Sequence, residues 1–225
     1  MRKRKKACNL DQQGNLGNLG ERVERVERVE RVERGATIVE SAIVMGIFFT
    51  LLMGLVEGGL RVFGISSVRS AVNEAARQGS TWAASPLADY EILRAVRSNT
   101  DSTPLDVTGV IIFKATGPNA VVPSGCLNEL AIGGDGVADL CNVYSDSRIR
   151  RLSKDRFGAQ AASENLWDHQ WPTALRQSAI SGTNEPDYLG VYLEASQRSL
   201  TGALPKHVFT PQTVMLLEPE RANTQ

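Results

Sequence analysis

The feature that most constrains this chain is a long apolar run near its N-terminus. Sixteen uncharged residues, Ser41–Val56, lie between Glu40 and Glu57, and apolar shoulders extend the run on both sides. A helix of this kind can cross the roughly 30 Å hydrocarbon core of a bilayer, because each residue adds about 1.5 Å. A cleavable secretory signal is the alternative, but its apolar core would be shorter and would end at a small-residue site, whereas this run ends in Glu57 and Arg61. The sequence therefore predicts a transmembrane helix over residues 36–64.

Charge is unevenly distributed along the chain, although the totals of basic and acidic residues are equal. Residues 1–35 hold ten Lys or Arg against six Asp or Glu, and Arg2–Lys6 is entirely basic. Basic residues before an apolar helix are typical of its cytoplasmic flank. We therefore expect a basic cytoplasmic leader over 1–35, and extracytoplasmic regions after the membrane helix. A nucleic-acid-binding arm is the alternative, but the apolar run follows at once, so no nucleic-acid partner is predicted.

Two kinds of sequence make up the rest of the leader. Residues 9–20 are polar, rich in glycine and expected to be flexible. Residues 21–34 repeat Glu-Arg-Val, which places each Glu four residues before an Arg and supports a helix by about 0.2–0.5 kcal/mol per pair. A marginal, solvated helix is expected there.

Beyond the membrane segment, residues 65–99 are expected to be helical. Small and apolar residues recur there at spacings of three and four, which predicts one buried stripe that continues the membrane helix. The stripe comprises Ile65, Val68, Ala71, Val72, Ala75, Ala76, Gly79 and Trp82 or Ala83. Ser85-Pro86 ends this helix and supplies the start of a second one through Ser98.

The last region, residues 100–225, has a strand pattern. Val107–Ala115, Tyr188–Ser196 and Thr213–Leu217 are rich in β-branched and apolar residues and are bounded by turn residues. Residues 117–147 are rich in turns, and residues 148–180 have too poor a period to assign a helix. The predicted fold is α+β: a long N-terminal transmembrane helix that extends into a small antiparallel sheet domain of three or four strands.

The three cysteines are divided by the membrane segment. Cys8 lies in the leader, whereas Cys126 and Cys141 lie in the β-rich region. If that region is extracytoplasmic, the two distal cysteines can form a disulfide, worth about 3 kcal/mol for a loop of this length. Two unpaired, buried cysteines are the alternative.

A short motif joins the leader to the apolar run: Gly35, four residues Ala36–Val39, and then Glu40. Substrates of prepilin peptidases share this arrangement, in which a basic leader ends in Gly and a Glu comes five residues after the cut. With the segments Gly54–Arg61 and Ala71–Gly79, the motif resembles the TadE-like proteins of tight-adherence (Tad) pilus systems.

The resemblance is strongest to the actinobacterial branch of that family. Val110–Ala115, Tyr188–Leu193 and the terminal Glu218-Pro219 are similar to the corresponding segments of that branch. The resemblance implies a pilin-like membrane subunit, cut between Gly35 and Ala36, that assists assembly of a surface pilus. Its implied partners are the membrane, a prepilin peptidase, other pilin or pseudopilin subunits and the Tad secretion machinery.

The chemistry of the junction explains why an acid lies in an apolar run. Cleavage creates an α-ammonium group at Ala36, and a buried carboxylate is tolerated only when it is paired. We expect Glu40 to pair with that ammonium, in its own or a neighbouring subunit. A carboxylate that reaches water at the inner interface beside Arg34 is the alternative.

Two further pairs of residues lie near the outer end of the apolar run. Glu57 and Arg61 are four residues apart, which suits either an ion pair within the helix or a contact between subunits. Gly54 and Gly58 form a Gly-x3-Gly pair, which permits close approach of two helices.

The sequence predicts no enzyme, cofactor or metal site. The alternative to a pilin-like subunit is an uncleaved, single-span protein with an extracellular binding domain. A membrane-tethered hydrolase that uses Asp168 and His169 is the third interpretation, but no ligand spacing or nucleophile motif supports it.

Overall fold

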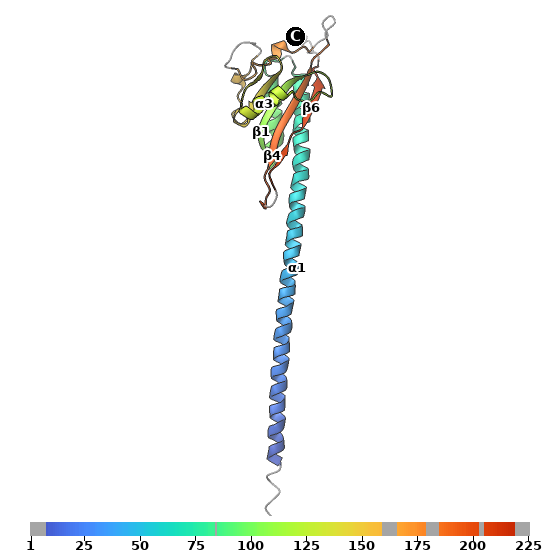
Figure 1. The fold of residues 1–225 in the computed structure, drawn as a ribbon, viewed down its shortest axis with the longest axis vertical. Helices are drawn as coiled ribbons and strands as arrows, with labels where there is room; N and C mark the ends of the chain where they lie inside the picture. Colours follow the sequence, from blue (N-terminus) through green and yellow to red (C-terminus); the bar gives the residue numbers. More distant parts are fainter. Residues whose placement is uncertain (1–7, 84, 159–165, 179–184, 203–204, 219–225) are drawn as a thin grey trace, which may run out of the picture. The chain divides into compact units, whose positions relative to one another are not determined.

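A computed structural model describes residues 8–83, 85–158, 166–178, 185–202 and 205–218, with side chains from Thr37 onward (Figure 1). The chain divides into two units, Met1–Val56 and Glu57–Gln225, and each is described by itself. Helix α1, Cys8–Thr81, contributes residues to both.

The first unit consists of the N-terminal part of α1. Every side chain from 37 to 56 is exposed. These twenty residues make a helix about 30 Å long, which matches the hydrocarbon thickness of a bilayer. Of the helices that the structure describes, α1 alone is long and apolar enough to cross a membrane, with a mean hydropathy of 2.2 in its most apolar window, none of which is buried.

The leader differs from the sequence expectation. Residues 9–20, expected to be flexible, lie within α1, which begins at Cys8. Extending an existing helix costs less than nucleating one, and the Glu-Arg repeat that follows favours helix. The glycine-rich stretch therefore extends, toward the N-terminus, the helix that the repeat favours.

The second unit contains an antiparallel sheet, as predicted (Figure 1). The strands are β1 (Asp106–Ala115), β2 (Gly136–Val137), β3 (Cys141–Ser145), β4 (Tyr188–Gln197), β5 (His207–Phe209) and β6 (Gln212–Leu216). Their order is β2-β3-β1-β4-β5, and β6 also pairs with β4. Strands β5 and β6 follow each other along the same edge of β4, joined by the hydrogen bond from Leu193 N to Pro211 O at 3.0 Å. The fold class is confirmed, but the sheet has six strands rather than three or four.

The remaining elements are helical and short. They are α2 (Ala88–Thr100), α3 (Ser124–Ile132), α4 (Asp146–Arg150) and the 3-10 turns Lys154–Arg156 and Thr173–Leu175. Helix α2 begins two residues later than the sequence suggests. The Ser85 hydroxyl oxygen accepts a hydrogen bond from the Leu87 backbone N–H at 3.3 Å, so this serine bonds to the turn that precedes the helix.

The sheet separates two apolar cores. Alternate residues of β1 point to opposite faces: Val110 and Ile112 enter the core that α1 and α2 share with the sheet, and Ile111 and Phe113 enter the core beneath α3. Each fully buried large side chain contributes about 1.5–3 kcal/mol relative to its exposed state. Burial on both faces explains why β1 has a continuous apolar run.

The predicted stripe on α1 supplies the helix side of the first core. The stripe residues from Val68 to Ala76 are buried. Of the two residues predicted for the end of the stripe, Ala83 is buried and Trp82 is 42% exposed. Ile65, at the start of the stripe, is also exposed. At Gly79 an added Cβ would lie 2.7 Å from Ile92 Cδ1, so the small residue permits the close approach of α1 and α2.

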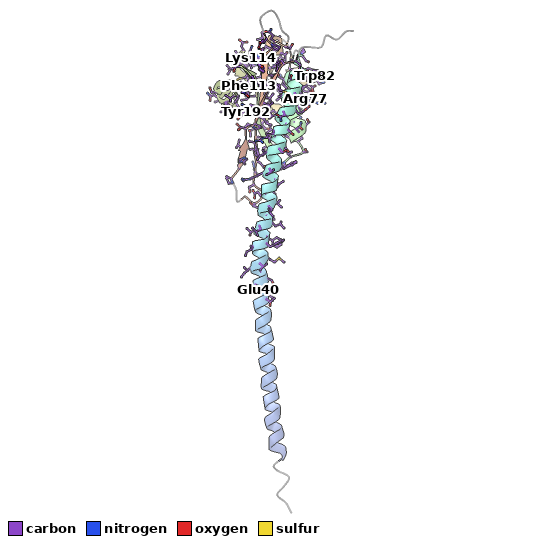
Figure 2. All side chains as sticks on the ribbon, turned by 90° about the vertical axis from the view of Figure 1, so that its right-hand side faces the viewer. Glu40, Arg77, Trp82, Phe113, Lys114 and Tyr192 are labelled. Atoms are coloured by element: carbon purple, nitrogen blue, oxygen red, sulfur yellow. A yellow bond between two sulfur atoms is a disulfide. The ribbon has the colours of Figure 1, made fainter. Side chains whose placement is uncertain are left out.

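Replacing Gly190 with alanine is expected to destabilise the second unit by about 1–3 kcal/mol, because the core is already filled. Phe113 lies directly opposite on β1, and an added Cβ would be 2.2 Å from its Cζ atom (Figure 2 labels Phe113). Denaturant unfolding followed by tryptophan fluorescence measures the change. Gly117→Ala is the matched control, because a Cβ there meets nothing within 4 Å. Equal stabilities for the two variants would contradict the packing argument.

Candidate functional site

The predicted processing junction lies within α1. The backbone is helical through Gly35 and Ala36, and Glu40 is exposed one turn further on (Figure 2). Residues four apart on a helix lie on the same face, so positions 36 and 40 are neighbours along it. No ion pair joins Glu40 to any residue that the structure describes. The pairing of Glu40 with a new ammonium at Ala36 stays a prediction, and the geometry of the helix permits it.

The Gly-x3-Gly pair lies on an open surface of α1. An added Cβ at Gly54 or Gly58 would meet nothing within 4 Å. The helix backbone is therefore accessible along this face. Its use in contact with another helix stays a prediction.

Glu57 and Arg61 have separate partners. Glu57 is only 6% exposed, and its Oε2 accepts a hydrogen bond from Thr201 Oγ1 at 2.8 Å. Arg61 Nη2 donates to the Pro205 carbonyl oxygen at 3.4 Å. Both side chains are described, and no ion pair forms between them within 4 Å. Both reach the turn that follows β4.

A third bond completes this arrangement: Gln197 Nε2 donates to the Leu60 carbonyl oxygen at 3.3 Å. The turn and the helix are thus joined at three successive points. We call the six residues that make these bonds the hairpin contact: Glu57, Leu60, Arg61, Gln197, Thr201 and Pro205. Sequence reasoning missed Gln197, the last residue of β4, and Thr201 and Pro205 of the turn, because nothing in a single sequence links positions more than 130 residues apart.

A buried polar network lies beside the larger core. Asp89 and Arg176, both fully buried, form an ion pair with 2.6 Å between Oδ1 and Nη1. Asp89 Oδ2 also accepts hydrogen bonds from Asn142 Nδ2 at 2.8 Å and from the Tyr144 hydroxyl at 2.7 Å. Burial and the Asp89 charge raise the pKa of Tyr144 well above its ordinary value, so its hydroxyl stays a donor. The network connects α2, β3 and the segment around Trp171.

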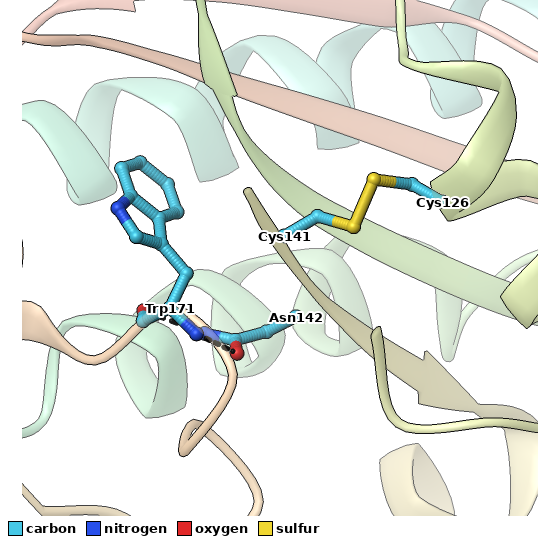
Figure 3. The surroundings of a disulfide bond; sticks show 4 residues. All are labelled: Cys126, Cys141, Asn142 and Trp171. Carbon is cyan, nitrogen blue, oxygen red and sulfur yellow. Dashed lines mark hydrogen bonds between the residues drawn. A yellow bond between two sulfur atoms is a disulfide. The ribbon is translucent and has the colours of Figure 1, made fainter. Parts of the chain in front are cut away.

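The side-chain amide of Asn142 binds the backbone of the segment around Trp171. Its Oδ1 accepts from Trp171 N at 2.8 Å, and its Nδ2 donates to Trp171 O at 2.9 Å (Figure 3). One residue earlier in β3, Cys141 forms a disulfide with Cys126 of α3. The disulfide and the amide thus attach two different segments to the same short strand.

Asp168 and His169 bond to their own loop. Asp168 Oδ2 accepts a hydrogen bond from Gly158 N at 3.2 Å, and burial, with the nearby charge of Asp89, raises the pKa of Asp168 to about 6. His169 Nδ1 lies 2.7 Å from the Leu166 carbonyl oxygen. In the described part of the chain no hydrogen bond joins Asp168 to His169, and no group of three metal-ligating side chains occurs.

Comparison with protein families finds a match to the model of TadE-like proteins over residues 35–77. No curated protein and no solved structure gives a significant match. The matched segment begins at the junction glycine, includes the exposed apolar run and ends within the buried stripe of α1. The resemblance to TadE-like proteins that the junction motif predicted is therefore confirmed over residues 35–77.

Proposed function

We propose that this chain is a minor pilin-like membrane subunit, that a prepilin peptidase cuts it between Gly35 and Ala36, and that it assists assembly of a Tad-type surface pilus. The observation that carries the proposal is the position of the family match. It begins at Gly35, where the basic leader meets the exposed apolar helix. The chain acts in this proposal through assembly and not through catalysis.

Cleavage has a direct physical consequence for the apolar helix. It removes the ten basic residues of the leader, which hold the N-terminus on the cytoplasmic side. It also provides the ammonium at Ala36 that neutralises Glu40, a charge that is otherwise unfavourable inside a bilayer. The processed helix can then leave the lipid and pack against other pilin or pseudopilin helices through its exposed apolar side chains.

The second unit is the extracytoplasmic part in this proposal. Its disulfide between Cys126 and Cys141 supports that location, because disulfides persist in oxidising compartments. Cys8 lies in the leader, on the reducing side. The chain is then a single-pass membrane protein with a cytoplasmic N-terminus.

The N-terminus of the mature protein tests the proposal. We expect cells with the cognate peptidase to yield a chain that begins at Ala36, and cells without it to yield the chain with its leader. Sequencing or mass spectrometry of the purified protein distinguishes the two products. An intact leader in cells with a working peptidase would refute the proposal and favour an uncleaved, single-span protein with an extracellular binding domain.

A further inference from the structure

The turn between β4 and β5 lies at the beginning of the second unit, because the hairpin contact fixes it there. Its earliest partner on α1 is Glu57. Glu57 directly follows Val56, the last residue of the continuously exposed apolar run. The turn therefore contacts the first residue of α1 that follows the exposed apolar run. In Figure 1 the coloured residues that directly follow β4 project from the lower end of the sheet.

The surface of this turn combines an apolar side chain with basic ones. Leu200 is 67% exposed, and Arg198 and Lys206 are also exposed. On α1, Val62 and Phe63 are exposed as well, so apolar surface continues past Glu57. Apolar side chains flanked by Lys and Arg are typical of segments that lie in the interface of a membrane.

We propose that the β4–β5 turn binds the phospholipid surface through which α1 emerges. Leu200 enters the boundary between headgroups and acyl chains, and Arg198, Lys206 and Arg61 bind lipid phosphate groups. Each guanidinium group has five N–H donors, so Arg61 can hold a phosphate while it donates to Pro205 O. This inference rests on membrane insertion of α1, which is part of the proposed function, and it does not require cleavage.

The position of Glu57 supports a lipid environment at this level. A carboxylate near the hydrocarbon boundary needs hydrogen-bond donors and shelter from lipid. The turn supplies both, because it buries Glu57 and places the Thr201 hydroxyl 2.8 Å from its carboxylate. The same turn carries exposed basic side chains, Arg198 and Lys206. It thus covers the acid and presents the opposite charge to the phosphate layer.

A fluorescent label at residue 200 tests the proposal in the full chain. Cys8→Ser removes the third cysteine, and Leu200→Cys provides a thiol that is labelled with bimane. The labelled protein is reconstituted in phosphatidylcholine vesicles that contain phosphatidylglycerol and a lipid with a nitroxide on its headgroup. The matched control is Leu175→Cys, also exposed, near the bond between Gln177 and Asp187 at the other end of β4. A strand of that length separates the two labels by about 30 Å. We expect the nitroxide to quench most of the fluorescence at 200 and little at 175.

Two further variants separate the possible outcomes. A label at Leu51→Cys, in the apolar run, is quenched by a deep acyl-chain nitroxide if α1 is inserted, so failure of insertion is detected independently. Replacing Arg198 and Lys206 with Gln is expected to weaken the turn's attachment to anionic vesicles about fivefold per cation.

With insertion shown, equal quenching at 200 and 175 overturns the proposal. Unchanged quenching at 200 in the Gln variant overturns recognition of lipid phosphate. Crosslinking of residue 200 to a second copy, together with protection from the nitroxide, would assign the turn to a contact between subunits instead.

Discussion

Replacing Asp89 with alanine is expected to destabilise the second unit by about 3–5 kcal/mol, the cost of leaving one charge of a buried ion pair without its partner. Arg176 would stay buried with no carboxylate 2.6 Å away, and Asn142 and Tyr144 would lose an acceptor. Chemical unfolding of the full chain in detergent, followed by tryptophan fluorescence, measures the change. Trp171 is a suitable probe, because the Arg176 guanidinium lies 4.3 Å from the centre of its ring.

Asp101→Ala is the matched control for this substitution. Asp101 also pairs with an arginine, Arg97, at 3.3 Å, but both side chains are substantially exposed. Exposed pairs contribute about 0–1 kcal/mol. If Asp89→Ala and Asp101→Ala destabilised the protein equally, the network would not be the structural element that we describe.

The paired charges at Asp89 also show where sequence reasoning ends. Asp89 and Arg176 come from segments that are separated by most of the globular unit, and neither has a motif around it. The helix pattern gave no signal of a buried acid, because Asp89 lies in the first turn of α2, where an acid is common at the surface. A buried network depends on tertiary contacts that no local pattern contains.

The strands likewise divide into those that the sequence predicted and those that it did not. The sequence predicted β1, β4 and β6 to within about two residues, the ordinary uncertainty of element boundaries. Those strands have enough β-branched and apolar residues to be recognised. Strands β2 and β5 have only two and three residues, and β3, Cys141–Ser145, has five. These three strands exist because a longer strand lies beside them, so their own sequences carry little signal.

At the candidate site, residue spacing along the helix predicted the buried stripe of α1 but not the partners of Glu57 and Arg61. The four-residue spacing of Glu57 and Arg61 suggested a pair within the helix, but the turn from β4 supplies nearer partners for both. The stripe on α1 was recognised because helical periodicity is a local property. The resemblance to TadE-like proteins was predicted for a similar reason, since the leader, Gly35 and the apolar run are contiguous.

Replacing Gly35 with leucine is expected to abolish cleavage, so that the protein keeps all 35 residues of its leader in cells with the cognate peptidase. The structure has the junction within a continuous helix, whereas a protease binds an extended backbone, so the helix must unwind there. Glycine favours unwinding by about 0.8–1.0 kcal/mol relative to a good helix former such as alanine, and leucine would remove most of that gain. It would also place a branched side chain next to the bond that is cut.

Gly46→Leu provides the control that makes this result interpretable. It makes the same substitution in the same helix, eleven residues beyond the junction, at a position where a Cβ meets nothing within 4 Å. If cleavage depends on the backbone at the junction, Gly46→Leu is processed normally and only Gly35→Leu accumulates with its leader. Mass spectrometry of the two proteins gives the answer. Normal processing of Gly35→Leu would show that the peptidase does not act at this glycine, and an equal defect in both variants would indicate a general effect on membrane insertion.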